Sequence, residues 1–357
     1  MKLFSTALII MVLAAGIREE SACENEFYKN WDIAPKEGAF KMDGWSIWGG
    51  SVIKIDDDEY YMYATRWPEE LSWQSWATNA EIVLAKANTP EGPYQFEKVI
   101  LPPRGKEFWD GRATLNPTII HHKGKYLLYY VGITYDFKQP VDSKPTRDMY
   151  EEAWNSKRIG LAIADSPDGP WERKDEPILH IRSGKWDGAI TSNPAPVVHE
   201  DGSVLLIYKS APVPYPERNQ NRAMRLGVVK AKHYSGSYER IEDNNQIKLK
   251  PIDTSIEDPF IWQSNDTYYM IAKCMNESIT GEKGAGFLAC SRNGIEWTIA
   301  EQPKAYSRTV ELSDGSIKEM PKLERPQVFF ENGQPTLVFF GARDDEDKFY
   351  NLVRPLK

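Results

Sequence analysis

Short apolar segments, each followed by a tight polar turn and an aromatic-rich segment, recur five times along this chain. Runs of four or five apolar residues bounded by Gly, Pro, Asn or Asp are typical of β-strands. The copies are spaced 66, 77, 65 and 67 residues apart, and they start at Ser51, Pro117, Pro194, Pro259 and Pro326. A fixed long period of this kind indicates a repeat architecture.

A second apolar segment that ends in a Gly-containing turn follows each of the first four copies, so each period holds about four short strands. These segments cover residues 82–94, 159–171, 226–238 and 287–297. Four-stranded antiparallel units repeated around an axis are propeller blades, and ring closure removes exposed sheet edges. The pattern therefore predicts an all-β fold, a five-bladed β-propeller with four antiparallel strands per blade. Because a single strand remains after Ala342, we expect a segment between Phe27 and Phe40 to complete the last blade.

The N-terminus has the pattern of a secretory signal. Lys2 precedes an apolar run, residues 3–15, that is too short to span a bilayer. We expect residues 1–22 to be a signal peptide and residues 23–357 to form one catalytic propeller domain that is secreted or periplasmic and has no transmembrane segment. Lipid anchoring at Cys23 is the alternative, although Glu20 stands where a lipobox carries an apolar residue.

Composition excludes several classes of partner. The net charge of -8 and the pI near 5.4 argue against nucleic acid and anionic membranes as partners. The five His residues are scattered, so neither a metal site nor a cofactor is expected. A disulfide between Cys274 and Cys290 is not favoured, since the hairpin register sets them out of line. We expect a monomer that binds carbohydrate, because 12 Trp and 18 Tyr provide a surplus of rings for stacking on sugars.

Four long segments are predicted on one face of the propeller, the face at which each innermost strand begins. Long loops in a compact domain are commonly binding loops or lids. They cover residues 67–80, 134–157, 211–225 and 275–283. We expect this face to form an axial funnel whose substrate-binding candidates are Trp48, Arg66, Trp67, Arg112, Asn116, Asn193, Lys209, Lys273 and Arg325, with Trp45, Trp73 and Trp76 as further stacking candidates.

Acidic residues concentrate at the same places. Glu257 and Asp258 are adjacent at the start of an innermost strand, where alternation directs one toward the axis and the other toward a blade interface. Glu324 precedes Arg325 in the same way, and an internal salt bridge of Glu324 is the structural alternative. Three Asp-Gly pairs lie upstream of innermost strands, and each is either a turn or a source of a funnel carboxylate. The catalytic candidates are Asp258, Glu324, Glu257, Asp187, Asp110 and Asp43.

Some of these segments resemble a known family. The Asp258-Pro259-Phe260-Ile261 segment, the Asn-Pro pairs at Asn116 and Asn193 and the outer hairpin 159–171 resemble the five-bladed β-propeller glycoside hydrolases around glycoside hydrolase family 43, from about Trp31 onward. The chain looks like an outlying branch, because Trp48-Gly49-Gly50-Ser51 replaces the Asp-Pro of the first blade and Asp-Pro appears in blade four.

The resemblance implies a secreted hydrolase of plant or algal polysaccharides or oligosaccharides. It also implies three axial acids that act as base or nucleophile, as acid and as modulator, with Asp258 as the core carboxylate. Cleavage requires two carboxyl groups roughly 5–9.5 Å apart, of which one is protonated. The cations of the funnel suggest an anionic sugar, although pairing with the acids explains them equally well. Two alternatives keep the fold: a uronate-oligosaccharide lyase or dehydratase with Lys273 as base, and a propeller that binds glycan without cleaving it.

Overall fold

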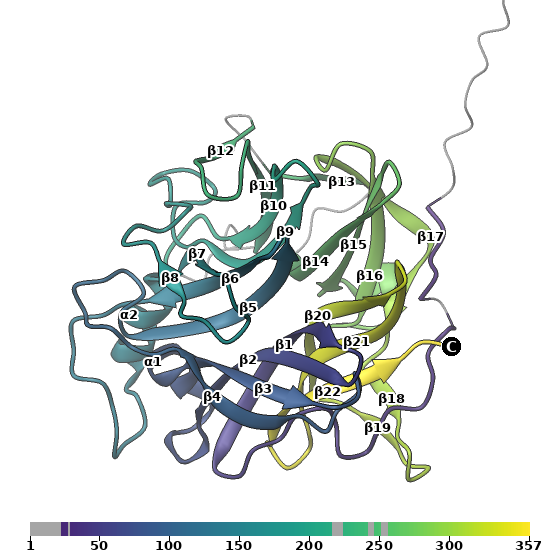
Figure 1. The fold of residues 1–357 in the computed structure, drawn as a ribbon, viewed down its shortest axis with the longest axis horizontal. Coiled ribbons are helices and arrows are strands. Elements are labelled where there is room, and N and C mark those ends of the chain that lie inside the picture. The colour runs from purple at the N-terminus through teal and green to yellow at the C-terminus, as the bar shows by residue number, and fades with distance from the viewer. Residues whose placement is uncertain (1–22, 28, 216–223, 242–245, 251–255) are drawn as a thin grey trace, which may run out of the picture.

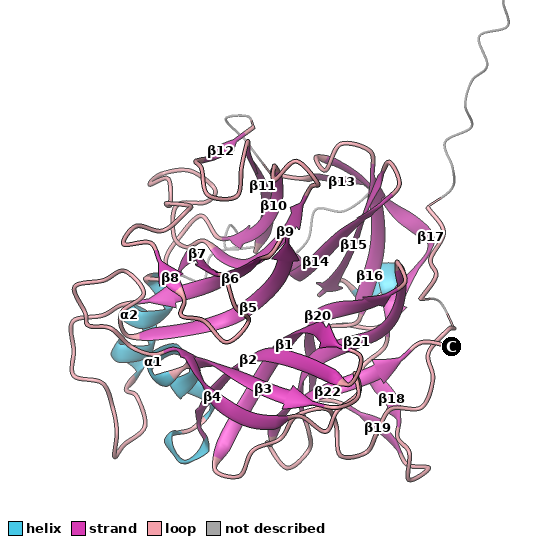
Figure 2. Cartoon of the chain, viewed as in Figure 1, coloured by secondary structure: helices cyan, strands magenta, loops and turns pink. Residues whose placement is uncertain are grey.

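The computed structural model describes residues 23–27, 29–215, 224–241, 246–250 and 256–357. The predicted signal peptide, residues 1–22, lies outside the described residues. Five mainly antiparallel sheets surround a central axis, and in each sheet the strand that contains the first apolar segment of the repeat lies nearest to it (Figure 1). Strands and the loops that join them make up most of the molecule, and the helices are few and short (Figure 2). The five-bladed β-propeller predicted from the repeat is confirmed.

The strands of the first three blades follow one another in chain order from the axis outward. Blade one contains β1 (Trp45–Asp56), β2 (Glu59–Pro68), β3 (Glu81–Ala87) and β4 (Gln95–Leu101). Blade two contains β5 (Ala113–His122), β6 (Lys125–Ile133), β7 (Arg158–Ala164) and β8 (Glu172–Arg173). Blade three contains β9 (Ser192–Val198), β10 (Val204–Ser210), β11 (Arg225–Ala231) and β12 (Tyr238–Arg240).

The last two blades depart from four strands. Blade four has β14 (Ile256–Ser264), β15 (Thr267–Cys274), β16 (Gly286–Ser291) and β17 (Glu296–Tyr306), and β13 (Lys248–Lys250) pairs in parallel with β17. The three strands of blade five are β20 (Lys322–Glu331), β21 (Gln334–Arg343) and β22 (Phe349–Pro355). A separate hairpin, β18 (Thr309–Glu311) and β19 (Ile317–Glu319), precedes blade five.

Short helices occupy the loops between the second and third strands of three blades. The first loop holds the 3₁₀ turns η1 (Glu69–Leu71) and η2 (Trp73–Ser75), and α1 (Trp76–Asn79) follows them. The second holds α2 (Arg147–Asn155), and the loop of blade four holds α3 (Glu277–Thr280). The insertions predicted at residues 67–80, 134–157 and 275–283 therefore lie where the sequence placed them, whereas the loop 211–225 falls partly outside the described residues.

The N-terminal segment completes blade five, as predicted. Isolated antiparallel bridges join Phe40 to Asn351 and Trp31 to Leu356 along the outer edge of β22. The Asn351 amide donates to the Phe40 carbonyl over 2.9 Å, and the Asp32 amide donates to Pro355 over the same distance. The segment thus covers the edge of the last sheet through separate bridges rather than through a continuous strand.

Deleting residues 24–40 is expected to abolish cooperative folding. The deletion uncovers the edge of β22 and removes the fully buried side chains of Phe27, Ala34 and Phe40 from two hydrophobic clusters. Thermal unfolding followed by near-UV circular dichroism would test this against the chain lacking only residues 1–22. A Cys23→Ser control separates the contribution of the segment from that of its disulfide, and a deletion variant that melts at the reference temperature would refute the closure role.

Cys274 and Cys290 are not joined by a disulfide, in line with the expectation, but Cys290 has a partner that the sequence did not predict. Cys23 forms a disulfide with Cys290 across 267 residues, and Cys274 is a buried free thiol. The disulfide uses the sulfur that a lipid thioether at Cys23 would need, so the lipid-anchor alternative is wrong for this structure. Protein disulfides persist in oxidising compartments. None of the helices in the described residues is long and apolar enough to cross a bilayer.

Candidate active site in the axial pocket

Every innermost strand carries a β-bulge at the same height on the axis. In β5, for example, Leu115 pairs with Val131 and Thr118 with Tyr129, so two residues oppose one. The first bulge residue has a positive φ in all five blades: Gly49 (66°), Asn116 (54°), Asn193 (51°), Asp258 (56°) and Arg325 (58°). Asn and Asp tolerate this left-handed conformation, and the proline after it needs no ladder hydrogen bond. A positive φ at Arg325 is unusual for a long side chain and marks a candidate functional position.

The bulges correct the alignment of the repeats in blade one. The sequence aligned Ser51 with the four prolines. In the structure Trp48 pairs with Thr65 and Ser51 with Tyr63, so Gly50 is the residue that is equivalent to the prolines of the other blades. Gly49 therefore occupies the position that Asn116, Asn193, Asp258 and Arg325 hold in the other blades. A Cβ at Gly49 would meet no atom within 4 Å, so this position of the ring is open.

A chain of hydrogen bonds links three of the bulge residues across three blades. The side-chain amide of Asn116 donates to Asn193 Oδ1 over 2.8 Å, and the amide of Asn193 donates to Asp258 Oδ1. Asp258 is only 4% exposed, and its bond to Asn193 fixes the orientation of the carboxylate. The repeat thus converts one backbone feature into a polar ring at the axis.

Lysines from one blade pair with glutamates of the next. Lys209 Nζ of blade three lies 2.9 Å from Glu257 Oε2 and 3.6 Å from Asp258 Oδ1. Lys273 Nζ of blade four lies 2.6 Å from Glu324 Oε1 of blade five. Each of the two lysines extends from the second strand of its blade, and each of the two glutamates immediately precedes a bulge. The ion pairs therefore join blades three, four and five.

Glu257, Asp258 and Glu324 each use one carboxylate oxygen for their hydrogen bonds and ion pairs. The other oxygen of each carboxylate is not bonded to any described residue. Glu257 uses Oε2, Asp258 uses Oδ1 and Glu324 uses Oε1, to which Lys322 also approaches within 3.9 Å. The second oxygen of each carboxylate has no hydrogen-bond partner among the described residues. Three oriented carboxylates, each with one unbonded oxygen, are what a reacting group in the pocket would meet.

The lysines fix the charge state of Glu257. Burial alone would raise the pKa of this carboxyl, but Lys209, Lys273 and Lys157 outweigh it and lower the pKa to about 2. Burial would likewise lower the pKa of Lys209 and Lys273, yet the acids beside them raise both. Glu257 is therefore an anion, and both lysines are cations, throughout the neutral range.

Acid is expected to weaken the fold through Glu257. A carboxyl whose pKa falls from 4.5 to about 2 on folding stabilises the protein above pH 4.5, and this contribution is lost as the pH drops toward 2. At pH 7 the contribution is on the order of 3 kcal/mol. Urea unfolding of the wild type and of Glu257→Gln between pH 7 and pH 2.5 measures it. A stability difference that does not change over this range would contradict the pairing.

The carboxylates face a pocket of about 330 Å³ with an aromatic rim. This volume lies in the range of small-molecule sites. Trp67, Trp73 and Trp76 come from the insertion of blade one, and Tyr150 and Trp154 come from α2. The insertions of blades one and two therefore supply most of the rings at the rim, which also includes Trp48 and Phe349. Flat aromatic faces around a polar base are suited to sugar rings.

Several solved structures with the same architecture are named as glycoside hydrolases. A family 117 glycoside hydrolase from the marine bacterium Zobellia galactanivorans aligns with a TM-score of 0.62 at 19% identity, over 93% of this chain and 90% of its own. A structure described as a glycoside hydrolase gives 0.64 at 15% identity, over 90% and 91%. A family 43 β-xylosidase/α-arabinofuranosidase from a compost metagenome gives 0.56 at 14%, over 92% and 95%. The chain has the fold of the five-bladed β-propeller glycoside hydrolases. No protein-family model matches the sequence, and no curated protein is similar to it in sequence.

Within this propeller glycoside hydrolase fold, most of the predicted site residues meet in the pocket. Nine of the fifteen line it, namely Trp48, Trp67, Asn116, Asn193, Lys209, Glu257, Asp258, Glu324 and Arg325. Lys273 stands directly behind Glu324 through its ion pair. The remaining five, which are Asp43, Arg66, Asp110, Arg112 and Asp187, do not line the pocket.

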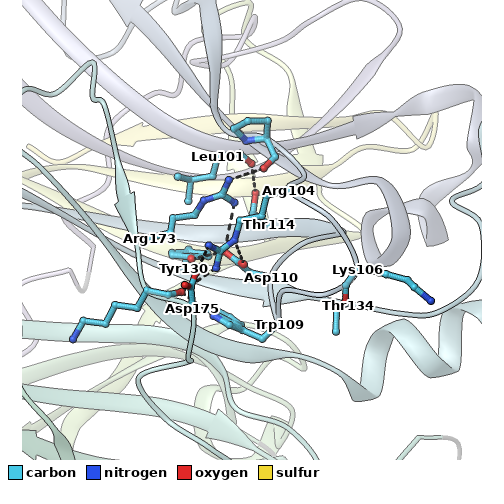
Figure 3. A network of polar contacts seen from close by, with 12 residues as sticks. Leu101, Arg104, Lys106, Trp109, Asp110, Thr114, Tyr130, Thr134, Arg173 and Asp175 are labelled. Carbon is cyan, nitrogen blue, oxygen red and sulfur yellow. Dashed lines mark hydrogen bonds and ion pairs between the residues drawn. The ribbon is translucent and has the colours of Figure 1, made fainter.

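Asp110 is placed inside blade two rather than at the axis. Its buried carboxylate accepts hydrogen bonds from Arg104 Nε (2.7 Å) and the Tyr130 hydroxyl (2.6 Å), and Arg173 lies 3.4 Å away (Figure 3). The preceding Trp109 stacks on Tyr130 with ring centroids 5.6 Å apart. The Trp-Asp-Gly segment thus anchors the loop that leads into β5. Asp110 has a structural role and does not supply a carboxylate to the funnel.

The same construction recurs at Asp187 in blade three. Arg182 Nε (2.9 Å), Arg240 Nε (2.8 Å) and the Tyr208 hydroxyl (2.8 Å) donate to its carboxylate, and Trp186 stacks on Tyr208. Both sites combine an arginine from the upstream loop with one from the outermost strand of the blade. Their repetition indicates that the motif stabilises the blades.

The other three predicted residues also have local roles outside the pocket. Arg66 pairs with Glu81 over 2.6 Å and stacks on Trp45, which removes this tryptophan from the stacking candidates. Arg112 Nε lies 3.3 Å from the Tyr135 carbonyl oxygen, to which it donates. Asp43 is exposed in the turn before β1.

Several lining residues were not predicted. Lys157 lies at the end of the blade-two insertion over Trp154, with 3.7 Å between its Nζ and the ring centroid. Lys322 opens β20 two residues before Glu324, and its alternation along the strand is a signal that could have indicated it. Tyr150 and Trp154 are spaced four apart, which places them on one face of α2. Thr65, Leu115, Ser192, Met224 and Phe349 complete the unpredicted lining.

Proposed function

We propose that this protein is a secreted glycoside hydrolase that cleaves glycosidic bonds of plant or algal polysaccharides or oligosaccharides in its axial pocket. The observation that carries the proposal is the convergence of Glu257, Asp258 and Glu324, each with one oxygen held and the other unbonded, under an aromatic rim. Glycoside cleavage needs such acids beside a bound sugar, and stacking on aromatic side chains would hold that sugar.

The charge state of Glu257 supports a division of roles. An oxocarbenium-like transition state requires one ionised carboxylate as base, nucleophile or stabiliser and one protonated carboxyl to donate to the leaving oxygen. Glu257 takes the ionised role because its pKa is lowered to about 2. Asp258 and Glu324 are the two candidates for the proton donor. Asn116 and Asn193 orient Asp258 and are placed to bind sugar hydroxyl groups.

The charges of the pocket favour a sugar that carries a negative group. Around the three acids stand five cations, Lys157, Lys209, Lys273, Lys322 and Arg325, so these groups leave a net positive charge. A uronate or sulfated sugar would complement this excess.

A screen of aryl glycosides and of digests of plant and algal polysaccharides tests the proposal. We expect release of sugar from at least one substrate by the monomeric protein, with elution in size-exclusion chromatography as the check on monomer. NMR of the first product anomer then separates inversion from retention. A protein that binds glycan but releases no sugar from the panel would contradict the hydrolase.

The geometry of the site disfavours the lyase alternative but is compatible with a propeller that binds glycan without cleaving it. A lyase that uses Lys273 as its base is disfavoured, because Glu324 and Glu257 raise the pKa of that lysine despite its burial. Binding without cleavage gains support from the cationic partner that each of the three acids has. The same screen decides this case, since a binding propeller has no turnover to lose.

A further inference from the structure

Arg325 is a buried cation at the base of the axial pocket. Only 2% of its surface is exposed, and the Nε and Nη1 atoms have no hydrogen-bond partner. Its remaining nitrogen, Nη2, makes a long 3.4 Å contact to the backbone carbonyl of Asn116. The guanidinium group of arginine has five N–H donors and no acceptor. This side chain therefore makes far fewer hydrogen bonds than it could.

No carboxylate of the described residues forms an ion pair with Arg325. Asp258, the acid on the neighbouring bulge, is already engaged through Oδ1 with Asn193 and Lys209. Glu324 precedes Arg325 in the chain but is bonded to Lys273. Burial lowers the pKa of Arg325, and the negative charge of Asp258 opposes this only in part. Burying a charged group without a partner costs free energy that a bound counter-ion would offset.

The ring position next to Arg325 on the side of blade one carries no side chain. Blades five and one are neighbours around the axis, and the ring position of blade one is Gly49, which has no side chain. Trp48, the residue before Gly49, and Lys322, three residues before Arg325, line the pocket. A ligand group can therefore approach the base of the pocket next to the guanidinium without displacing a ring side chain.

We propose that Arg325 is the centre of an anion-recognition site at the base of the axial pocket, which takes the carboxylate or sulfate group of an acidic sugar. The inference deepens the proposed function and names the substrate class of the same pocket. An inorganic anion such as chloride resembles these sugar groups in one respect: it is a compact negative charge that accepts hydrogen bonds from N–H groups.

Equilibrium binding tests the site without turnover. D-glucuronate and D-glucose differ only at C6, where a carboxylate replaces the hydroxymethyl group, and tryptophan fluorescence reports on a pocket lined by five Trp side chains, those of residues 48, 67, 73, 76 and 154. In a buffer free of chloride and sulfate, we expect the wild type to bind D-glucuronate about tenfold or more tightly than D-glucose, and Arg325→Gln to lose this preference. Arg354→Gln is the matched control, because Arg354 is also buried with an unpartnered Nε but does not line the pocket.

A second titration separates the two sources of negative charge. If sodium chloride alone changes the fluorescence of the wild type and competes with D-glucuronate, and if Arg325→Gln is insensitive to it, a free anion also occupies the site. If Arg325→Gln fails to fold, Arg325→Lys replaces it, and we expect a weakened preference for D-glucuronate. The inference is overturned if neither D-glucuronate nor chloride binds, or if the variants keep the wild-type preference. The sugar-release screen is independent, so a failed hydrolase and a failed anion site give different results.

Discussion

Replacing Glu257 with Gln is expected to lower kcat/KM for the cleaved glycoside by roughly three orders of magnitude. Glutamine keeps the size of the side chain and can still accept the hydrogen bond from Lys209 Nζ, which lies 2.9 Å from Oε2 in the wild type. What the substitution removes is the negative charge that Lys209, Lys273 and Lys157 hold in place. A pocket that loses this anion while keeping its cations would repel the positive charge that develops on the sugar ring.

The control for this prediction is Glu282→Gln. Glu282 also belongs to blade four and also has a lowered pKa, because a hydrogen bond from Ser307 and nearby cations outweigh its burial. It does not line the pocket, so its replacement should leave kcat/KM within a factor of about two while testing for a general effect of losing an ion pair. Steady-state kinetics with circular dichroism as the folding check would measure both variants. Equal activity of Glu257→Gln and wild type would remove Glu257 from the proposed chemistry.

Asp187→Asn is expected to destabilise the protein by about 3–5 kcal/mol, because it leaves two arginines around an uncharged group. The Asp187 side chain is fully buried, and Arg182 and Arg240 both donate to it over less than 3 Å. The amide of asparagine would place one NH₂ group against donors that need acceptors. Urea unfolding measures the change in the free energy of unfolding.

A surface aspartate provides the contrast for this variant. Asp165 pairs with Lys125 but is 83% exposed, so Asp165→Asn should change stability by less than about 1 kcal/mol. At temperatures where Asp187→Asn remains folded, its kcat/KM should match the wild type, since Asp187 lies outside the pocket. A loss of activity without a loss of stability would return Asp187 to the catalytic candidates.

The fold could be predicted because its signals are periodic. The five strand pairs and the turns between them repeat every 65–77 residues, and ring closure by the N-terminal segment followed from the missing strand after Ala342. The disulfide could not be predicted in the same way. Cys23 and Cys290 are brought together only by the path of the N-terminal segment along blades five and four, which no local pattern encodes.

The candidate site residues also include some that the sequence could predict and some that it could not. Residues at the bulges, such as Asn193 and Asp258, were found because their place in the repeat fixes their place at the axis. Asp110 and Asp187 repeat just as regularly, and the sequence alone cannot separate a carboxylate directed at the axis from one directed into a blade. Their arginine partners on β8 and β12 decide this, and those partners lie 63 and 53 residues away in the chain.

The open ring position at Gly49 has a consequence for how such pockets evolve. Gly49 has the same left-handed backbone as Asp258, and a Cβ there would touch nothing within 4 Å. A single nucleotide change converts any glycine codon into a codon for an acidic residue, or for alanine or valine. One mutational step can therefore place a carboxylate at the ring position of blade one, with no rebuilding of the scaffold required.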